Sequence, residues 1–169
     1  IADLLGYARL GREAVTVQPV ALRAAGDEAL EPLRARVERT RAQVEVSEDL
    51  GVALAHRPTL VLSLQNLLEN ALKFVAPGQT PRVTVRAEDV GERVRLWVED
   101  RGIGIAPEHQ ARVFRVFERL HGEAQYPGTG IGLAIVRRAV QRMEGRVLLE
   151  STPERGSRFG IELAAVAAP

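Results

Sequence analysis

The segment NLLENALKF, residues 66–74, places two carboxamides and one ammonium group at helical spacing. Asn66, Asn70 and Lys73 are four and three residues apart, so on an α-helix they share one face. Carboxamide oxygens are ligands that Mg²⁺ accepts, and a lysine ammonium binds phosphate as a point charge. The segment is therefore a candidate site for a metal–phosphate group, although an ordinary solvated helix face has the same pattern.

Lys73 is the only lysine among the 23 lysine and arginine residues of the chain. A chain rich in arginine can keep one lysine at any position by chance. A phosphate site has a reason to keep it, because an ammonium on a flexible stem is compact while a guanidinium is a planar fork. The residue alone leaves both interpretations open, and the neighbouring motifs have to decide.

DRGIGI, residues 100–105, follows directly on an alternating strand pattern. Gly102 and Gly104 permit backbone torsions and close approaches that a β-carbon would block. Asp100, at the strand end, can accept a hydrogen bond from an exocyclic amine such as that of adenine. An Asp-initiated turn without a ligand is the common alternative.

GTGIGLAI, residues 128–135, is a second glycine segment, and it opens a predicted helix. Backbone amides at a helix start, together with the positive end of the helix dipole, suit a polyphosphate. The segment is not the dinucleotide fingerprint, because Leu133 or Ile135 stands where the third glycine belongs, and no P-loop pattern occurs. Each glycine segment alone is weak support for a site.

The elements around these segments predict an α+β fold. It is a two-layer α/β sandwich, in which a mixed, mainly antiparallel sheet packs on about three helices. Helical periodicity covers residues 21–40 (with a kink or a start at Pro32), 58–75 and 130–143 (ended by Gly145). Strand patterns cover residues 43–47, 52–55, 83–87, 94–98, 146–151 and 157–163. Residues 100–129 are predicted to be a long functional loop with a short helix near residues 112–119.

The beginning of the chain predicts a further helix that is followed by an extended connector. Apolar residues recur at helical spacing, at Ile1, Leu4, Leu5 and Ala8. Pro19 disfavours helical geometry at the preceding residue, so residues 15–20 are expected to be extended. The helix pattern is already present at the first residue, so we expect the chain to be part of a longer protein.

Composition excludes several classes of function. Apolar residues make up 46% and charged residues 27% of the 169 residues, as in ordinary globular domains. The formal net charge is +1, so we expect no nucleic-acid binding and no direct membrane contact from this chain. It has no cysteine, which excludes disulfides and thiolate metal sites and suits a cytoplasmic location. No apolar run approaches the roughly 20 residues of a membrane span.

Taken in order, these motifs resemble the ATP-binding catalytic domain of sensor histidine kinases, a family that shares its nucleotide-binding fold with gyrase and the heat-shock chaperones. NLLENALKF is similar to the N box, DRGIGI to the G1 box, FRVF to the F box, GTGIGL to the G2 box and GSRF to the final glycine motif. The sequence of the segment FERLHGEAQYPGTGIGLAI looks most like that of bacteriophytochrome-type kinases. The resemblance implies a dimerisation and phosphoacceptor helix ending within residues 1–14, a linker over 15–20, a catalytic domain over 21–165 and a tail over 166–169.

The resemblance also implies roles for individual residues. Asn70 would bind Mg²⁺ with Asn66 nearby, Asp100 would bind the adenine amine, and Arg119 and His121 would lie in a lid near the γ-phosphate. The implied catalytic residues are Asn66, Lys73 and Arg119. The implied ATP-binding residues are Asn70, Lys73, Asp100, Gly102, Gly104, Gly128, Thr129, Gly130, Gly132 and Leu133.

The implied activity is transfer of the γ-phosphate of ATP to a histidine on an upstream helical domain, and then to an aspartate of a response regulator. The implied partners are that domain, the regulator and a second copy in a homodimer. His56, His109 and His121 all lack the family's phosphoacceptor context, so the chain alone should bind ATP·Mg²⁺ without phosphorylating itself. A protein acting mainly as a response-regulator phosphatase is the alternative. A gyrase-type ATPase is least favoured, because Asn66 stands where that branch has its catalytic glutamate.

Overall fold

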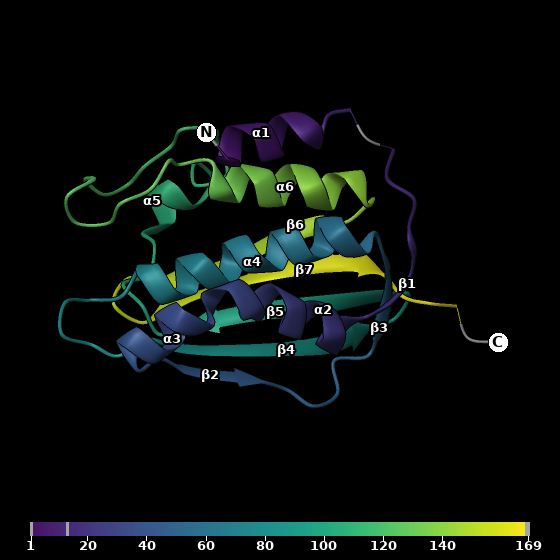
Figure 1. Cartoon of the computed structure of the whole chain (residues 1–169), viewed down its shortest axis with the longest axis horizontal. Helices are drawn as coiled ribbons and strands as arrows, with labels where there is room; N and C mark the ends of the chain where they lie inside the picture. Colours follow the sequence, from purple (N-terminus) through teal and green to yellow (C-terminus); the bar gives the residue numbers. More distant parts are fainter. Residues whose placement is uncertain (1, 13, 168–169) are drawn as a thin grey trace.

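Five strands of the computed structural model form one mixed sheet, in the order β2-β4-β5-β7-β6 (Figure 1). The model describes residues 2–12 and 14–167, so Ile1, Glu13, Ala168 and Pro169 lie outside the described residues. The strands of this sheet are β2 (Gln43–Val46), β4 (Arg82–Val90), β5 (Arg93–Asp100), β6 (Arg146–Thr152) and β7 (Gly156–Ala164). The pair β2–β4 is parallel and the other pairs are antiparallel. This arrangement confirms the predicted fold class and the predicted hairpin of β4 and β5.

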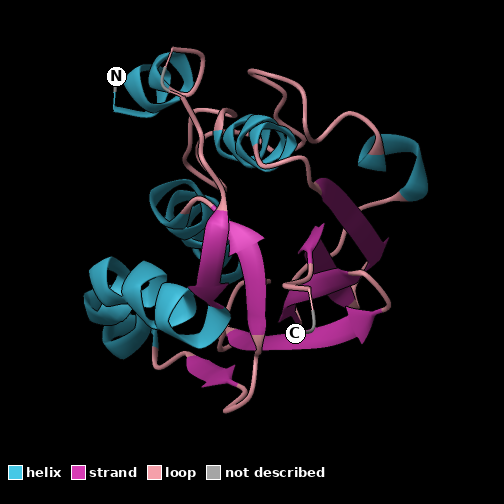
Figure 2. Ribbon diagram, turned by 90° about the vertical axis from the view of Figure 1, so that its right-hand side faces the viewer, coloured by secondary structure: helices cyan, strands magenta, loops and turns pink. Residues whose placement is uncertain are grey.

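Helices cover one face of this sheet. The helices are α1 (Ala2–Arg9), α2 (Leu22–Leu30), α3 (Arg34–Thr40), α4 (Arg57–Lys73), α5 (Pro107–Gln110) and α6 (Gly132–Arg142), with a 3₁₀ turn, η1 (Glu31–Leu33). Figure 2 shows α2, α4 and α6 grouped on one side of the strands. Their buried residues meet the alternating inward residues of the sheet, such as Val85, Leu96 and Ile161, in one apolar core. No helix in the described ranges is both long enough and apolar enough to cross a membrane.

The opposite face of the sheet is covered by its own charged side chains. Trp97 is only 2% exposed, although no helix covers it. The guanidinium of Arg158 lies 4.3 Å from its ring centroid, and the indole Nε1 donates to Glu88 over 2.9 Å. Gly160 is opposite Trp97 in the register, and a Cβ there would lie 2.8 Å from the indole ring. The ring thus fits over a glycine, under a layer of arginine and glutamate.

The extended connector expected over residues 15–20 is partly a paired strand. Gln18–Ala21 form β1, which pairs antiparallel with β3 (Val52–Ala55) in a separate two-stranded sheet. Pro19 lacks a backbone donor and fits only an edge strand, and both strands of a two-stranded sheet are edge strands. The helix expected over residues 21–40 is interrupted by η1 at Pro32, so this proline lies at the break and not at the start of the helix.

One local prediction beside the site is wrong. The short helix is not near residues 112–119 but at Pro107–Gln110, and turns follow it. Phe114 packs edge-on against Phe159, and Phe117 has a φ of 61°, which an α-helix does not allow. Tertiary contacts therefore override the apolar spacing of this segment.

The end of α6 also differs from the prediction. The left-handed residue is Glu144, with a φ of 57°, and the Gly145 amide donates to the Val140 carbonyl over 2.9 Å. A Cβ on Gly145 would lie 2.6 Å from the Glu162 carbonyl oxygen. This glycine is therefore needed for the close approach of β7 and not for a left-handed torsion.

Candidate functional site

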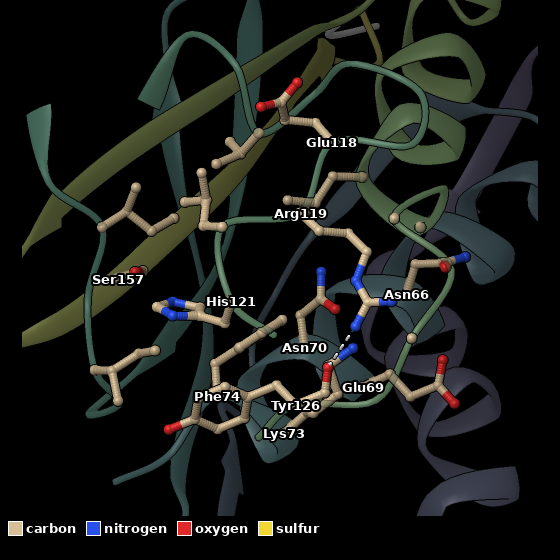
Figure 3. Close-up of a pocket in the computed structure, with 18 of the residues that line it drawn as sticks. Asn66, Glu69, Asn70, Lys73, Phe74, Glu118, Arg119, His121, Tyr126 and Ser157 are labelled. Carbon is tan, nitrogen blue, oxygen red and sulfur yellow. Dashed lines mark hydrogen bonds between the residues drawn. The ribbon is translucent and has the colours of Figure 1, made fainter. Parts of the chain in front are cut away.

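A cavity of about 330 Å³ lies between α4, the loop after β5, the start of α6 and the segment 118–130 (Figure 3). The predicted residues that line it are Asn66, Asn70, Lys73, Asp100, Gly104, Arg119, His121, Gly128, Thr129, Gly130, Gly132 and Leu133. Segments that are far apart in the sequence therefore meet around one space. Gly102 is the only predicted residue that does not line this cavity.

Helix α4 presents its polar face to the cavity, because its leucines face the core. Leu60, Leu64, Leu67 and Leu68 are at most 2% exposed, and Asn66, Asn70 and Lys73 lie half-buried on the other side. The Asn66 amide nitrogen donates to the Leu62 carbonyl over 2.9 Å. Its Oδ1 is then directed to the start of α6, where it would lie 3.0 Å from a Cβ on Gly132. The helix thus supplies carboxamide oxygens beside the α6 amides.

Lys73 lies at the C-terminal end of α4, next to the second glycine segment. A Cβ on Gly128 would lie 2.5 Å from the lysine Nζ, and this nitrogen is 4.6 Å from the Phe74 ring centroid. Burial lowers the pKa of Lys73, and the nearby cations Arg36 and Arg119 lower it further. An anion bound among these cations would offset both effects. This end of the cavity therefore favours a negatively charged group.

Asp100, at the end of β5, also lines the cavity. Its Oδ1 accepts hydrogen bonds from the backbone amides of Gly102, over 2.8 Å, and Ser157, over 3.3 Å. Burial raises the pKa of this carboxyl to about 6, and the two amide bonds oppose that shift. No hydrogen bond joins Oδ2 to another described residue. This oxygen is available to a donor on a ligand.

The glycines after Asp100 allow this loop to lie against α4 and the β6–β7 turn. The Ile103 amide donates over 3.0 Å to the carbonyl of Phe74, the C-terminal capping residue of α4. A Cβ on Gly102 would overlap that same carbonyl, and a Cβ on Gly104, whose φ is 70°, would overlap the Thr152 carbonyl. Gly102 thus contributes through packing behind Asp100, and this packing brings the carboxylate to the same cavity as Lys73.

The segment 118–130 closes the remaining side of the cavity. Arg119 donates to the Tyr126 carbonyl over 3.2 Å (Figure 3). The Tyr126 hydroxyl donates to the Val75 carbonyl over 3.0 Å. The rings of Phe74, His121 and Tyr126 lie 5.2 to 6.1 Å apart in one aromatic cluster. These contacts join the segment to the end of α4.

Helix α6 directs its N-terminus to the cavity. It is 11 residues long, and its capping residue, Ile131, makes no side-chain hydrogen bond to the first amides. Gly130 has a φ of 73°, and a Cβ on it would lie 3.0 Å from the Glu118 carbonyl oxygen. The first turn therefore offers free backbone donors to a phosphate group.

The lining residues that were not predicted as site residues include Asp3, Arg36, Glu69 and Ser157, which carry charged or hydroxyl side chains. Asp3 comes from α1, and its carboxylate accepts a hydrogen bond from the Thr129 hydroxyl over 2.8 Å. Arg36 comes from α3, and no local pattern connects these helices to the site. Ser157 was within reach of prediction, because it belongs to the GSRF motif and lies opposite Asp100 in the register.

The donor set suits Mg²⁺ only if phosphate supplies part of the coordination. In residues 2–12 and 14–167, no group of three or more histidine, aspartate or glutamate side chains could hold a metal ion. Two carboxamides and the exposed Glu69 lie beside the cationic end of the cavity. Mg²⁺ commonly keeps waters and binds substrate phosphates with only one or two protein ligands. Asn70 and Asn66 thus fit a metal ion that arrives with a polyphosphate.

Comparison with known proteins gives a consistent result. Residues 55–166 match the family described as "Histidine kinase-, DNA gyrase B-, and HSP90-like ATPase". Cyanobacterial phytochrome A of Nostoc sp. is 35% identical over 159 residues, which cover 94% of this chain and 20% of that protein. The crystal structure of full-length ShkA in complex with AMPPNP has a TM-score of 0.80 and 33% identity, over 99% of this chain and 36% of that one.

A mycobacterial sensor histidine kinase, MprB, has a TM-score of 0.75 and 29% identity, over 88% of this chain and 97% of that structure. The chain therefore spans nearly all of one solved kinase structure, but only about a fifth of the length of the phytochromes it matches.

Proposed function

Because the chain belongs to the histidine kinase-, DNA gyrase B- and HSP90-like ATPase family, as an ATP-binding catalytic domain of histidine kinase type, we propose that it binds ATP with Mg²⁺ and donates the γ-phosphate to a histidine. The observation that carries this proposal is that Asp100 and Lys73 line one cavity. Asp100 suits an amine donor and Lys73 suits an anion, as an adenine nucleotide requires.

At the adenine end, the exocyclic amine would donate to Asp100 Oδ2, because Oδ1 is already occupied by two backbone amides. Gly104 lines the same cavity, and its backbone would lie against the base. Gly102 keeps the loop against α4 from behind. These contacts would fix the purine and leave the triphosphate directed to the other end.

At the phosphate end, Lys73, Arg119 and the first amides of α6 would bind the triphosphate, with Gly128, Thr129, Gly130, Gly132 and Leu133 around them. Asn70 would bind Mg²⁺, with Asn66 beside it. The metal would supply charge neutralisation on the phosphates, which dominates catalysis of phosphoryl transfer. The protein groups would hold the phosphates in place.

The acceptor histidine is proposed to lie upstream of this chain. His56 bonds to Thr59 Oγ1 over 2.7 Å at the start of α4, and His121 belongs to the aromatic cluster beside the cavity. His109 lies in the four-residue helix α5. We propose a homodimeric cytoplasmic protein in which residues 1–14 end the acceptor domain and a response regulator receives the phosphate. Because β1 pairs with β3, the proposed linker shortens to residues 15–17.

Labelled ATP tests both halves of this proposal. The 169-residue chain should bind ATP·Mg²⁺ by calorimetry and remain unlabelled when incubated alone. Adding the upstream helical domain should produce an acid-labile phosphohistidine on that domain. Asn70→Ala should lower the Mg²⁺ dependence of ATP binding. Strong label on the chain alone would contradict the placement of the acceptor.

Steady-state kinetics distinguish the alternative activities. A gyrase-type ATPase needs a general base where this chain has Asn66, whose amide nitrogen is bonded to the Leu62 carbonyl. We therefore expect slow hydrolysis, and fast turnover would favour that alternative. A time course of regulator phosphorylation with the longer protein separates a net kinase from a net phosphatase.

A further inference from the structure

Three polar side chains form one cross-strand row, and two of them, Asp100 and Ser157, line the cavity. Asp100 of β5 is opposite Ser157 of β7, and Ser157 is opposite Ser151 of β6. The core on the helix side of the sheet contains Val98, two residues before Asp100, and Phe159, two residues after Ser157. Because side chains alternate along a strand, the row lies on the cavity side as well.

The hydroxyl of Ser151 has three hydrogen-bonding neighbours but only one proton. The Ile105 amide donates to its Oγ over 2.8 Å, so one acceptor position is occupied. The Gly156 carbonyl oxygen is 3.0 Å away and can only accept. The Ser157 Oγ is 2.7 Å away and can act in either direction.

Counting the protons decides this direction. If Ser151 donates to the Gly156 carbonyl, Ser157 donates to Ser151, and both hydroxyl protons are used within the protein. If Ser151 donates to Ser157 instead, its bond to the Gly156 carbonyl is lost and the Ser157 proton has no partner among the described residues. Buried polar groups strongly favour the arrangement with more bonds, and Ser157 is only 8% exposed.

We infer that Ser151 is a specificity-determining positioning residue, which fixes the Ser157 hydroxyl as a hydrogen-bond acceptor towards the purine. This inference rests on the proposed nucleotide site. Asp100 Oδ2 and Ser157 Oγ then present only acceptors to the 6-position of the base. A 6-amino group, as in adenine, donates to these oxygens, whereas a 6-oxo group, as in hypoxanthine, meets acceptors and is repelled.

The ratio of the Kd values for ITP and ATP, measured by calorimetry with Mg²⁺ at pH 7.5, tests this role. Ser151→Ala frees the Ser157 proton to rotate towards the base, so the ITP/ATP ratio should fall about fivefold, the size of one neutral hydrogen bond. Ser151→Thr keeps the hydroxyl and should keep the ratio. Ser47→Ala, in the loop after β2, is the matched serine control and should also leave the ratio unchanged.

A double-mutant cycle separates this role from a merely structural one. In a Ser157→Ala background no hydroxyl remains to be oriented, so adding Ser151→Ala should leave the ratio unchanged. An equal fall in both backgrounds would overturn the inference, because Ser151 would then act through the Ile105 loop. An unchanged ratio in the single variant, with urea unfolding showing an intact fold, would overturn it as well. If the parent chain bound neither nucleotide, the proposed function itself would fail, which is a different result from binding without a change in ratio.

Discussion

Asp100 combines a raised pKa with a fixed orientation. Its Oδ1 accepts two backbone amides, so a proton would add to Oδ2, the oxygen proposed to bind the adenine amine. Burial raises the pKa of this carboxyl from 3.8 to about 6. In the pH range between these two pKa values, the folded chain holds a proton on Asp100 that the unfolded chain has released. The contribution of Asp100 to the free energy of unfolding therefore falls as pH rises through this range.

Adenine nucleotide binding should therefore weaken in acid. Below pH 6 the protonated Oδ2 becomes a donor that faces the adenine amine, which is also a donor. ATP affinity should therefore fall about tenfold for each pH unit below 6. Calorimetry from pH 5 to 8 measures this effect. Asp100→Asn should bind weakly and keep only the pH dependence that the phosphates contribute. A parent chain with the same slope as Asp100→Asn would contradict the role of the carboxylate.

Lys73 is predicted to act on the phosphates and not on the base. Lys73→Met keeps much of the stem but removes the charge, so ATP affinity should fall about 10- to 100-fold, the size of a charge-assisted hydrogen bond. Adenosine affinity should change little. Competition binding with both ligands measures the difference. Arg82→Met, at the start of β4 and outside the residues that line the cavity, is the matched control, and an equal loss for adenosine and ATP would refute the prediction.

At the scale of elements, the loop after β5 depends on a close approach that only glycine allows. Gly104 has a φ of 70°, and a Cβ there would overlap the Thr152 carbonyl. Gly104→Ala should lower the free energy of unfolding by about 2 kcal/mol or more, because both torsion and contact are unfavourable. Urea unfolding measures the loss.

Gly78 supplies the matched control for this prediction. It has a φ of 80°, but nothing lies within 4 Å of a Cβ there. Gly78→Ala should therefore cost only the torsional part, about 1 kcal/mol. Equal losses in the two variants would show that the contact with the β6–β7 turn is unimportant.

At the scale of the whole molecule, the N-terminal helix lies against the site. Tyr7 and Leu10, in and just after α1, belong to an apolar cluster with Ile131 and Ile135 of the α6 region. This packing places the Asp3 carboxylate at the Thr129 hydroxyl, on the cavity wall. A carboxylate at this position opposes the binding of a polyphosphate.

Asp3→Asn should therefore strengthen ATP binding. Asp3 is exposed, so the gain should be small, about two- to fivefold at low ionic strength, and it should shrink as salt is added. Titrations at two salt concentrations measure it. Asp89→Asn, at the far end of the β4–β5 hairpin, removes the same charge from an exposed position and should have no effect. A gain of equal size in both variants would mean that only the net charge matters.

Most of the fold could be predicted from the sequence, because each helix and strand has a characteristic spacing of apolar residues over a short stretch of chain. The alternation of Val94, Leu96 and Val98 predicts a strand buried on one face, and the leucine spacing of residues 60–72 predicts the orientation of α4. The polar face of α4 and both glycine segments were recognised for the same reason. Each of these signals depends on neighbours within a few residues.

Only the tertiary structure decided how distant segments meet. The pairing of β1 with β3, the turns after α5 and the contact of Asp3 with Thr129 all depend on which surfaces are still free once the core has formed. The row of Asp100, Ser157 and Ser151 depends on the register of three strands. Local periodicity indicates which face of a helix or strand is buried. It does not indicate which other element covers that face, because many elements would bury a similar apolar area. The sequence thus determined the elements and the chemistry that they carry, and the packing of the chain decided which of those groups share one cavity.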